Sequence, residues 1–489
     1  MIQHILSTNP FTANISAALE NHAQAADAPH NAALRGHWQE QHRGELPSWF
    51  AVTDLAAAAI GAATSNIAAF VSEQAGVPPP KVTIDRRLAS LWFGWSISPS
   101  GWSMPAPWDP LAGDYQAQDG WIKLHTNAPH HRRAALKALG LDTLQTPEPT
   151  DVAQAVSRFN KDVLEARVIA LNGCAAAMHS RSEWQSHPQG KAVAAEPLIL
   201  WTDHTQTTGA AKTSLEASID YPLQGLKVLD LTRVLAGPVA SRFLARFGAN
   251  VLRIDPLDWE EPGVVPEVTL GKRCAGLDLK TANGRAQLKA LLQDADILLH
   301  GYRPGALDNL GLGRGVRASL NPNLIDVSLS AYGHSGPWAQ RRGFDSLVQM
   351  SCGIADWGMR QAKSAVPSPL PVQALDHATG YLMAAATIRG LRERYTHGRV
   401  LQAQLSLART GLLLSGTGGT SLLRAEQPEL TAQSSSDLDS WPEATAWGPA
   451  RRLKFPAHID GLDTQWQHCL LYTSPSPRDQ RGSRMPSSA

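Results

Sequence analysis

The sequence predicts an α/β protein, with a Rossmann-like open parallel sheet in a large domain and a smaller α+β domain beside it. One observation is a short apolar run, GLKVLDL at 225–231, which is typical of a buried parallel strand. It is followed, before Gly248, by apolar residues at helical spacing: Val239, Phe243, Leu244 and Phe247. A second apolar run, NVLRID at 250–255, completes a strand–helix–strand crossover, whose first loop is where open α/β sheets bind ligands.

Further strands of the same sheet are expected at ILLHG (297–301) and LIDVSLS (324–330), with helices between them. Such a crossover usually suggests a dinucleotide site, with Asp255 holding a ribose. A dinucleotide fingerprint needs three glycines, whereas the loop TRVLAGP offers only Gly237, followed by Pro238. The sequence therefore disfavours a nicotinamide or flavin enzyme, and no NAD is expected.

A long Ala-rich helix is predicted on each side of the small domain, and the two segments look alike. Each has an apolar residue, an aspartate, a helix of small residues, a turn and a strand-like run: PSWFAVTDLAAAAIG…KVTIDRRLAS and PVQALDHATGYLMAA…LQAQLSLART. Asp54 in the first copy therefore corresponds to Asp376 in the second. We therefore expect the same element twice, as in a partial duplication or a permutation of modules.

The expected organisation follows from these elements and from the linker composition. Residues 1–46 have no assigned role, 47–100 form the first helix–strand copy, and 101–201 form the small α+β domain. A Thr/Ser/Ala-rich linker at 202–222 leads to the large domain at 223–430, which includes the second helix, and to a C-terminal segment at 431–468. From Cys469 onward the chain lacks hydrophobic periodicity, and it is expected to be a non-native read-through or else a Ser/Pro-rich tail.

Bulk composition excludes several classes of function. The 44 basic and 43 acidic residues give a net charge of +1, so no nucleic-acid or anionic-membrane partner is expected. Four widely spaced cysteines indicate neither zinc nor disulfides, and they favour a cytoplasmic protein. His125, His130 and His131 have no partner at ligand spacing, so no metal is expected. The N-terminus has no signal-peptide pattern, and the apolar segment 55–71 is expected to be a packed helix.

Four segments, in this order between Gly225 and Arg394, resemble the class III CoA-transferases, the family of formyl-CoA:oxalate and carnitine CoA-transferases. They are GLKVLDLTRVLAGPVASRFLARFGANVLRID, GKRCAGLDLKTANGRAQLKALLQDADILLHGYRPGALDNLGLG, NPNLIDVSLSAYGHSGPWAQRRGFDSLVQ and PVQALDHATGYLMAAATIRGLRER. The resemblance implies an enzyme that moves CoA from an acyl-CoA to a carboxylic acid, with coenzyme A as the only cofactor. It also implies an interlaced homodimer.

The resemblance assigns the nucleophile to Asp376, in ALDHATG. Spacing alone favours an ordinary N-cap at Asp376, because aspartate is among the commonest caps, and the resemblance reverses that preference. At a helix N-terminus we expect the backbone N–H groups to keep such a carboxylate ionised. The matching CoA-contact positions are Val234, Leu235, Ala236, Lys280, Gly301, Tyr302, Arg303 and Arg342, with a solvated charge as the alternative for each basic residue. Asp54 is the alternative carboxylate.

The sequence departs from the family pattern in several places. Gly301–Tyr302 replaces an Asn–Phe-type pair, and Pro256 replaces an arginine found in some members. The only candidate for the family's Gly-rich active-site loop is GTGGT at 416–420. A related racemase would need a histidine in the triplet Gly343–Phe344–Asp345, and phenylalanine cannot carry a proton. A catalytically silent CoA-binding protein is the remaining alternative. The acids that such an enzyme would use cannot be deduced from these residues.

Overall fold

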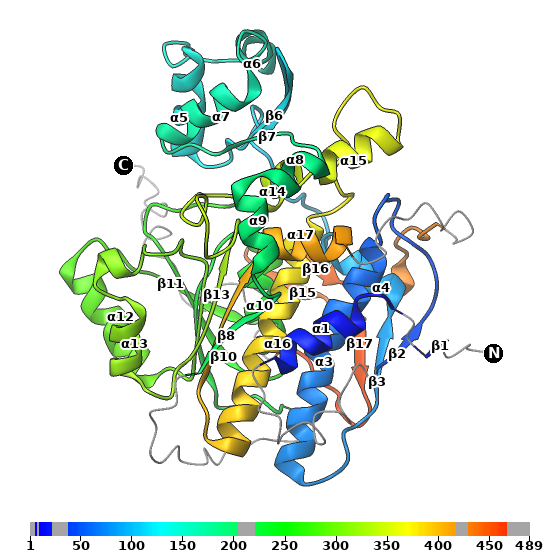
Figure 1. The fold of residues 1–489 in the computed structure, drawn as a ribbon. Coiled ribbons are helices and arrows are strands. Elements are labelled where there is room, and N and C mark those ends of the chain that lie inside the picture. The colour runs from blue at the N-terminus through cyan, green and yellow to red at the C-terminus, as the bar shows by residue number, and fades with distance from the viewer. Residues whose placement is uncertain (1–4, 7–8, 22–37, 204–220, 417–428, 467–489) are drawn as a thin grey trace, which may run out of the picture.

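The computed structural model describes residues 5–6, 9–21, 38–203, 221–416 and 429–466. A central α/β body carries a small domain at one end, which is the uppermost part of Figure 1. The predicted linker (mostly 204–220), the glycine-rich stretch after Gly416 and the tail from Cys469 lie outside the described residues.

The body is built on a seven-stranded sheet with the order β11-β10-β9-β12-β13-β14-β8. Neighbouring strands run parallel except for β8, which is antiparallel to β14 at one edge. The strands are β8 (Leu200–Asp203), β9 (Lys227–Leu231), β10 (Asn250–Asp255), β11 (Lys272–Gly276), β12 (Ile297–His300), β13 (Ile325–Ser330) and β14 (Leu401–Ser406). The predicted α/β class with an open, mostly parallel sheet is confirmed.

The order of strands creates a switch point between β9 and β12. The chain passes from β9 to β10 and β11 on one side, and then resumes at β12 on the other side of β9. Loops that leave β9 and β12 therefore diverge at the carboxyl edge of the sheet, where open α/β sheets bind ligands. The sequence did not predict β8 or β11, and the boundary expected at 201 falls inside β8.

Helices cover both faces of the sheet, because alternate residues of its central strands point to opposite sides. Val228 and Leu299 pack in the core formed with α10 and α16, whereas Leu229 and Leu298 pack in the core formed with α12. The helices of this part are α10 (Ala236–Arg246), α11 (Val265–Val268), α12 (Ala282–Asp294), η2 (Asp308–Leu310), α13 (Arg314–Leu320), α14 (Asp345–Ser351), α15 (Ile354–Gln361), α16 (Ala374–His397) and α17 (Leu407–Gly416).

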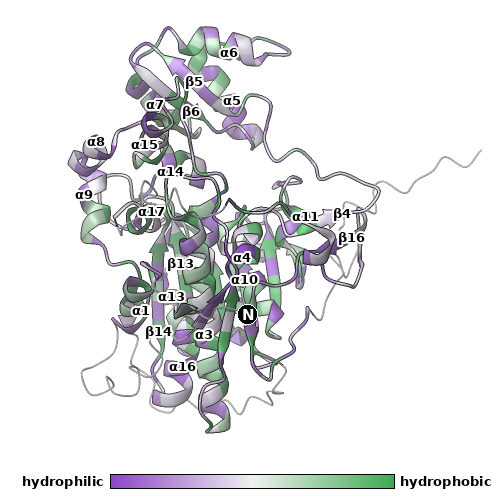
Figure 2. Ribbon diagram, turned by 90° about the vertical axis from the view of Figure 1, so that its right-hand side faces the viewer, coloured by the Kyte–Doolittle hydropathy of each residue, from purple (hydrophilic) through white to green (hydrophobic). Residues whose placement is uncertain are grey.

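Helix α3 (Val52–Ala75) lies beside α16, and Figure 2 shows the pair below the small domain. Both helices have 24 residues, begin after residues with nearly the same backbone angles and end at a left-handed glycine. Asp54 and Asp376 are each the third residue of their helix. Each helix is followed by a strand and a short helix, so the strand-like runs predicted after them end in helical turns. Origin by duplication stays a prediction.

Helix α3 is long and apolar enough to cross a membrane, but 89% of its most apolar window is buried inside the protein. It packs on α1 (Thr12–Glu20), on α4 (Arg86–Trp92) and on a second, four-stranded sheet. The strands of that sheet, in spatial order, are β1 (Ile5–Leu6), β2 (Trp38–Gln41), β3 (Val82–Asp85) and β17 (Ala457–Ile459). The C-terminal segment therefore returns to the N-terminal part of the chain.

The small domain has its own apolar core under a three-stranded antiparallel sheet. Its elements are β5 (Gly113–Ala117), β6 (Gly120–Leu124), β7 (Ala175–Ala177), α5 (Pro129–Leu139), α6 (Pro149–Val156) and α7 (Lys161–Ala170). Helices α8 (Arg181–Ser186) and α9 (Pro188–Ala195) lead from it back to β8.

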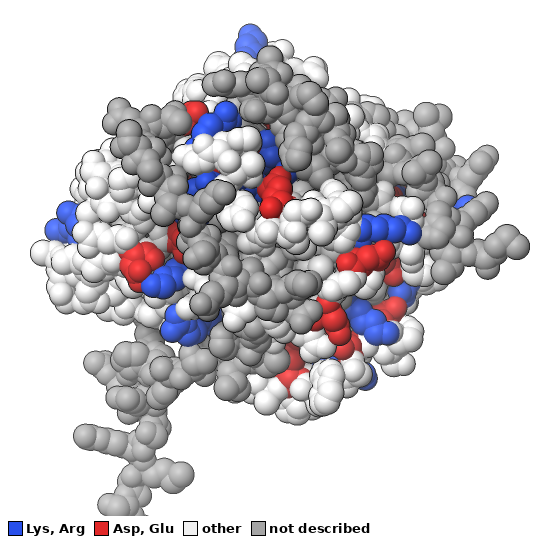
Figure 3. All heavy atoms as spheres, turned by 90° about the horizontal axis from the view of Figure 1, so that it is seen from below, with Lys and Arg blue, Asp and Glu red and all other residues white. Residues whose placement is uncertain are grey.

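A third small sheet joins the segment before the small domain to the C-terminal segment. It contains β4 (Ile97–Pro99), β15 (Glu443–Thr445) and β16 (Gly448–Arg452), and a 3-10 turn, η4 (Ser435–Asp437), precedes it. Acidic and basic side chains are interspersed on the face of the molecule seen in Figure 3.

Candidate active site

Two cavities lie at the carboxyl edge of the large sheet, near the first turns of α10, α14 and α16. One has a volume of about 830 Å³ and is lined by Arg233, Lys280, Arg303, Arg341 and Arg342, and we call it the basic cavity. The other has a volume of about 480 Å³ and is lined by Phe93, Trp95, Trp108, Trp259 and Phe344, and we call it the aromatic pocket. Both are lined by Asp376, so this carboxyl group lies where the two spaces meet.

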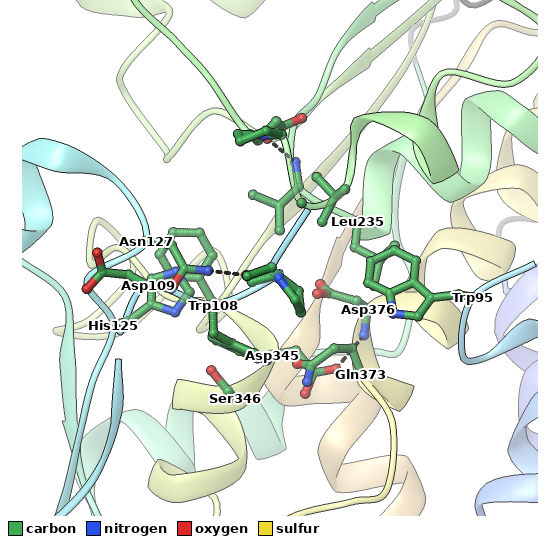
Figure 4. Close-up of a pocket in the computed structure, with 18 of the residues that line it drawn as sticks. Trp95, Trp108, Asp109, His125, Asn127, Leu235, Asp345, Ser346, Gln373 and Asp376 are labelled. Atoms are coloured by element: carbon green, nitrogen blue, oxygen red, sulfur yellow. Dashed lines mark hydrogen bonds between the residues drawn. The ribbon is translucent and has the colours of Figure 1, made fainter. Parts of the chain in front are cut away.

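Asp376 is only 7% exposed, and Figure 4 shows its carboxylate between Trp95 and Trp108. The residue at the N-cap position of α16 is Gln373, and Asp376 is the third helical residue. Its backbone N–H donates to the carboxylate of Asp345 (2.9 Å), whereas its own carboxylate has no hydrogen-bond partner among the described residues. Asp376 is therefore not an ordinary N-cap, and its side chain is free to meet a ligand.

The expectation that the helix N-terminus would keep Asp376 ionised is wrong. Burial and the neighbouring Asp345 raise the pKa of Asp376 well above its ordinary value of 3.8. The reason is that Asp345 accepts the backbone N–H groups of Leu375 and Asp376, which would otherwise stabilise a carboxylate on the helix itself. When ionised, Asp376 is a more basic and more nucleophilic carboxylate than an exposed one.

Asp345 is fully buried in the first turn of α14 and holds the start of α16. Besides the N–H of Asp376, its carboxylate accepts a hydrogen bond from Gln349, whose own carbonyl oxygen accepts the N–H of Leu370 (2.7 Å). Burial raises the pKa of Asp345 to about 6. In the same triplet, the ring of Phe344 stacks on His125, with 3.8 Å between centroids.

The basic cavity contains seven of the eight residues predicted to contact CoA: Val234, Ala236, Lys280, Gly301, Tyr302, Arg303 and Arg342. The eighth, Leu235, lines the aromatic pocket. They come together because they follow β9, β12 and β13 or precede the helices that start at the same edge. Val234 has φ +65°, a strained conformation for a β-branched residue, and such strain is concentrated at functional sites.

The cations of the basic cavity differ in how they are held. Arg303 and Arg342 donate to the backbone carbonyls of Gln340 (3.0 Å) and Asn172 (2.9 Å), whereas the side chain of Lys280 is 82% exposed. Burial and the nearby Arg342 lower the pKa of Arg303, which indicates that these two guanidinium groups repel each other. In the described part of the chain, neither guanidinium donates to a carboxylate, and such a pair of cations is suited to an anionic ligand.

Asp54 occupies a different environment from Asp376. It is 3% exposed and accepts a hydrogen bond from Arg86 (2.6 Å), which also contacts Glu40 and Glu45. Asp54 lines neither the basic cavity nor the aromatic pocket. Asp54 and Asp376 thus occupy the same position in their helices but have different surroundings.

Residues 223–443 match CoA-transferase family III. The matched region includes the large sheet from β9 onward, Asp376 and every cation of the basic cavity.

The chain is 35% identical over 191 residues to the probable fatty acyl-CoA transferase Rv3272 of Mycobacterium tuberculosis, an alignment that covers 36% of this chain and 48% of that protein. It is 30% identical over 264 residues to the succinyl-CoA:glutarate CoA-transferase of Mus musculus, covering 51% and 55%. The orthorhombic crystal structure of Rv3272 aligns with 32% identity and a TM-score of 0.38, over 40% of this chain and 56% of that one. The chain spans about half the length of the curated relatives it matches.

Several residues of the site were not predicted from the sequence. Arg233 lies between the rings of Trp259 (5.0 Å) and Tyr302 (5.4 Å) at the basic cavity. Its position directly after a predicted strand was an available signal. Trp95 and Trp108 come from a segment outside the region that matches CoA-transferase family III, and no motif marks them.

The three histidines considered for a metal site line these spaces instead. Burial lowers the pKa of His125 and of His131 to about 3, so both imidazoles are neutral. Within the described part of the chain, no group of three or more His, Cys, Asp or Glu side chains is arranged to hold a metal ion.

Proposed function

We propose that this protein is a CoA-transferase, moving CoA from an acyl-CoA thioester to a free carboxylic acid. The observation that carries the proposal is the position of Asp376. An unpartnered carboxylate lies where a cavity lined by cations meets a pocket lined by aromatic rings. The phosphates of CoA suit the cations, the acyl group suits the rings, and the thioester between them falls at Asp376.

The reaction needs one carboxylate nucleophile and no redox chemistry. The Asp376 carboxylate attacks the thioester carbonyl, the C–S bond breaks, and CoA leaves as a thiolate from an acyl-aspartyl anhydride. The thiolate then attacks the Cγ of Asp376, which releases the first acid as a carboxylate and leaves an aspartyl-CoA thioester. The acceptor acid repeats the two steps in reverse order, and Asp376 is regenerated.

Burial of Asp376 supports this chemistry in two ways. A carboxylate with a raised pKa is a stronger nucleophile once it is ionised, and a site with little water protects the anhydride from hydrolysis. Asp345 contributes by fixing the first turn of α16, so that the reacting carboxyl group has one position. Asp345 is thus a positioning residue in this proposal.

The alternatives are less well supported. A racemase would need a proton carrier at Phe344, which instead packs its ring against His125. A catalytically silent protein would not require an accessible, unpartnered carboxylate at Asp376. Asp54 is ion-paired with Arg86 and is less suited to attack a thioester. A homodimer stays a prediction, and light scattering of the full chain would test it.

Intact-mass measurement after incubation with an acyl-CoA tests the proposal. We expect an adduct equal to CoA minus one water, mapped by peptide analysis to Asp376. The Asp376→Asn variant should form no adduct while it still binds CoA, and the matched Asp54→Asn variant should form the adduct normally. An adduct on Asp54, or none with any acyl-CoA, would refute the assignment.

A further inference from the structure

The aromatic pocket is distinctive in the charges that surround it. Its described lining contains five carboxyl groups and no lysine or arginine: Asp109, Glu260, Glu261, Asp345 and Asp376. The only other titratable side chains are His125, His131 and His377, and burial lowers the pKa of each to about 3. At neutral pH these imidazoles carry no charge, so the described lining offers no cation to a second carboxylate.

Cations behind the wall are paired with carboxylates, and Arg253 is ion-paired with Glu261 of the lining itself. Arg132 donates to Asp109 (3.1 Å), and Lys123, whose ammonium lies 5.9 Å from the Trp108 ring, donates to Asp114 (2.9 Å). The cations of the site all lie on the other side of Asp376, in the basic cavity. Among the residues that the structure describes, lysine and arginine side chains therefore line the space where CoA would bind, and none lines the space where the acyl group would bind.

The remaining surface of the pocket is apolar and large. Figure 4 shows Trp95 on one side of Asp376 and Trp108 with His125 on the other, with Leu235 above. The volume of about 480 Å³ exceeds by severalfold the roughly 150 Å³ of a cavity that holds benzene. An aromatic ring or a medium-length alkyl chain thus fits beside the reacting carboxylate.

We propose that the acyl substrates are carboxylic acids with an uncharged, apolar or aromatic chain, and that acids with a second carboxylate are excluded. This inference rests on the proposed CoA transfer and adds its substrate class. A second carboxylate in the pocket would lose its hydration and meet other carboxyl groups without a compensating cation, which costs several kcal/mol. Trp95 and Trp108 supply apolar wall for the acyl chain, and the lack of a lysine or arginine in the described lining sets this selectivity.

Near-isosteric pairs of acyl-CoA donors test the inference on the full chain. Hexanoyl-CoA is compared with glutaryl-CoA, and valeryl-CoA with succinyl-CoA, by kcat/KM and by the CoA adduct on Asp376. We expect the uncharged member of each pair to be preferred by at least about 100-fold, and 3-phenylpropanoyl-CoA to be accepted. Equal or better use of glutaryl-CoA, with the adduct still on Asp376, would overturn the substrate class and leave the transfer reaction intact. Absence of an adduct with every donor would overturn both.

A matched pair of variants separates charge from shape. Trp108→Arg places a guanidinium in the wall, whereas Trp108→Leu removes the same ring without adding charge. The quantity compared is the kcat/KM for hexanoyl-CoA divided by the kcat/KM for glutaryl-CoA. We expect the arginine variant to lower this ratio by at least about tenfold, and the leucine variant to leave it within about threefold of the wild type. An equal decrease of this ratio in both variants would refute the role of charge in substrate selection. Titration of the full chain with 3-phenylpropanoate and with glutarate should show binding of the first only, and the reverse preference would also overturn the inference.

Discussion

Glu267 connects three parts of the chain, and its replacement by glutamine should measure how strongly they hold together. Its carboxylate is fully buried and ion-paired with Arg242 and with Arg452 (3.2 Å). It also accepts the N–H groups of Ser96 and Ile97, each at 3.1 Å. These partners belong to the large domain, to the C-terminal segment and to the segment that carries Trp95.

The contacts of Glu267 give the expected loss of stability in two ways. The two arginines lower the pKa of Glu267, against the effect of burial, from 4.5 to about 2, and this difference corresponds to about 3 kcal/mol of stability at pH 7. Removing the charge also leaves two buried guanidinium groups uncompensated, which typically costs 3–5 kcal/mol. Because the pKa is lower in the folded state, the contribution is complete above pH 4.5 and is lost as the pH falls towards 2.

Urea denaturation of Glu267→Gln at pH 7 should therefore show a loss of about 3 kcal/mol in the free energy of unfolding. The control is Asp294→Asn, which removes an exposed ion pair with Lys227 and should cost less than about 0.5 kcal/mol. Since Ser96 adjoins Trp95, we also expect a higher KM for the acyl substrate. A loss below about 1 kcal/mol, or one no larger than that of the control, would refute the reasoning.

Three further predictions concern the active site. Asp345→Asn removes a negative charge beside Asp376, so the pKa of Asp376 should fall and the acid limb of the kcat/KM profile should move to lower pH; an unchanged limb would contradict this. Arg342→Ala should weaken CoA binding about tenfold by calorimetry, and most at low salt, whereas the exposed control Arg360→Ala should have no effect. Asp376→Asn should raise the free energy of unfolding at pH 8, because the folded state disfavours the ionised carboxylate, and the gain should disappear below pH 3.8; a loss of stability at pH 8 would be evidence against the raised pKa.

Most of the large sheet could be predicted because its strands are local patterns. The runs at 225–231, 250–255, 297–301 and 324–330 are continuous and apolar, as expected for strands buried on both faces. Strand β11 was missed because KRCAG is polar in sequence. Its Lys272 is fully buried only by pairing with Asp230 (3.0 Å), a contact 42 residues away that no local pattern contains.

The site was predictable where it depends on the ends of strands and helices, and not where it depends on packing between modules. Residues that follow β9 and β12 had to meet at one edge of a parallel sheet, so the predicted CoA contacts line one cavity. The raised pKa of Asp376 was not predictable, because it depends on burial in the folded protein and on the side chain of Asp345, which reaches the N–H groups of a helix 31 residues later. Trp95 reaches the same carboxylate from 281 residues earlier in the chain, and only tertiary structure brings them together.

The two sides of the site therefore have different origins within the chain. Arg233, Lys280, Arg303 and Arg342 all lie in the region 223–443 that matches CoA-transferase family III, so this region supplies the cations of the side assigned to CoA. The wall formed by residues 93–95 and 106–109 comes from outside the matched region and is attached to it through Glu267. Substitutions in the wall should alter the choice of acyl group with little effect on CoA affinity, and substitutions of the cations should do the opposite. Asp376 lines both sides and carries the reacting carboxyl group, so a change there should affect both.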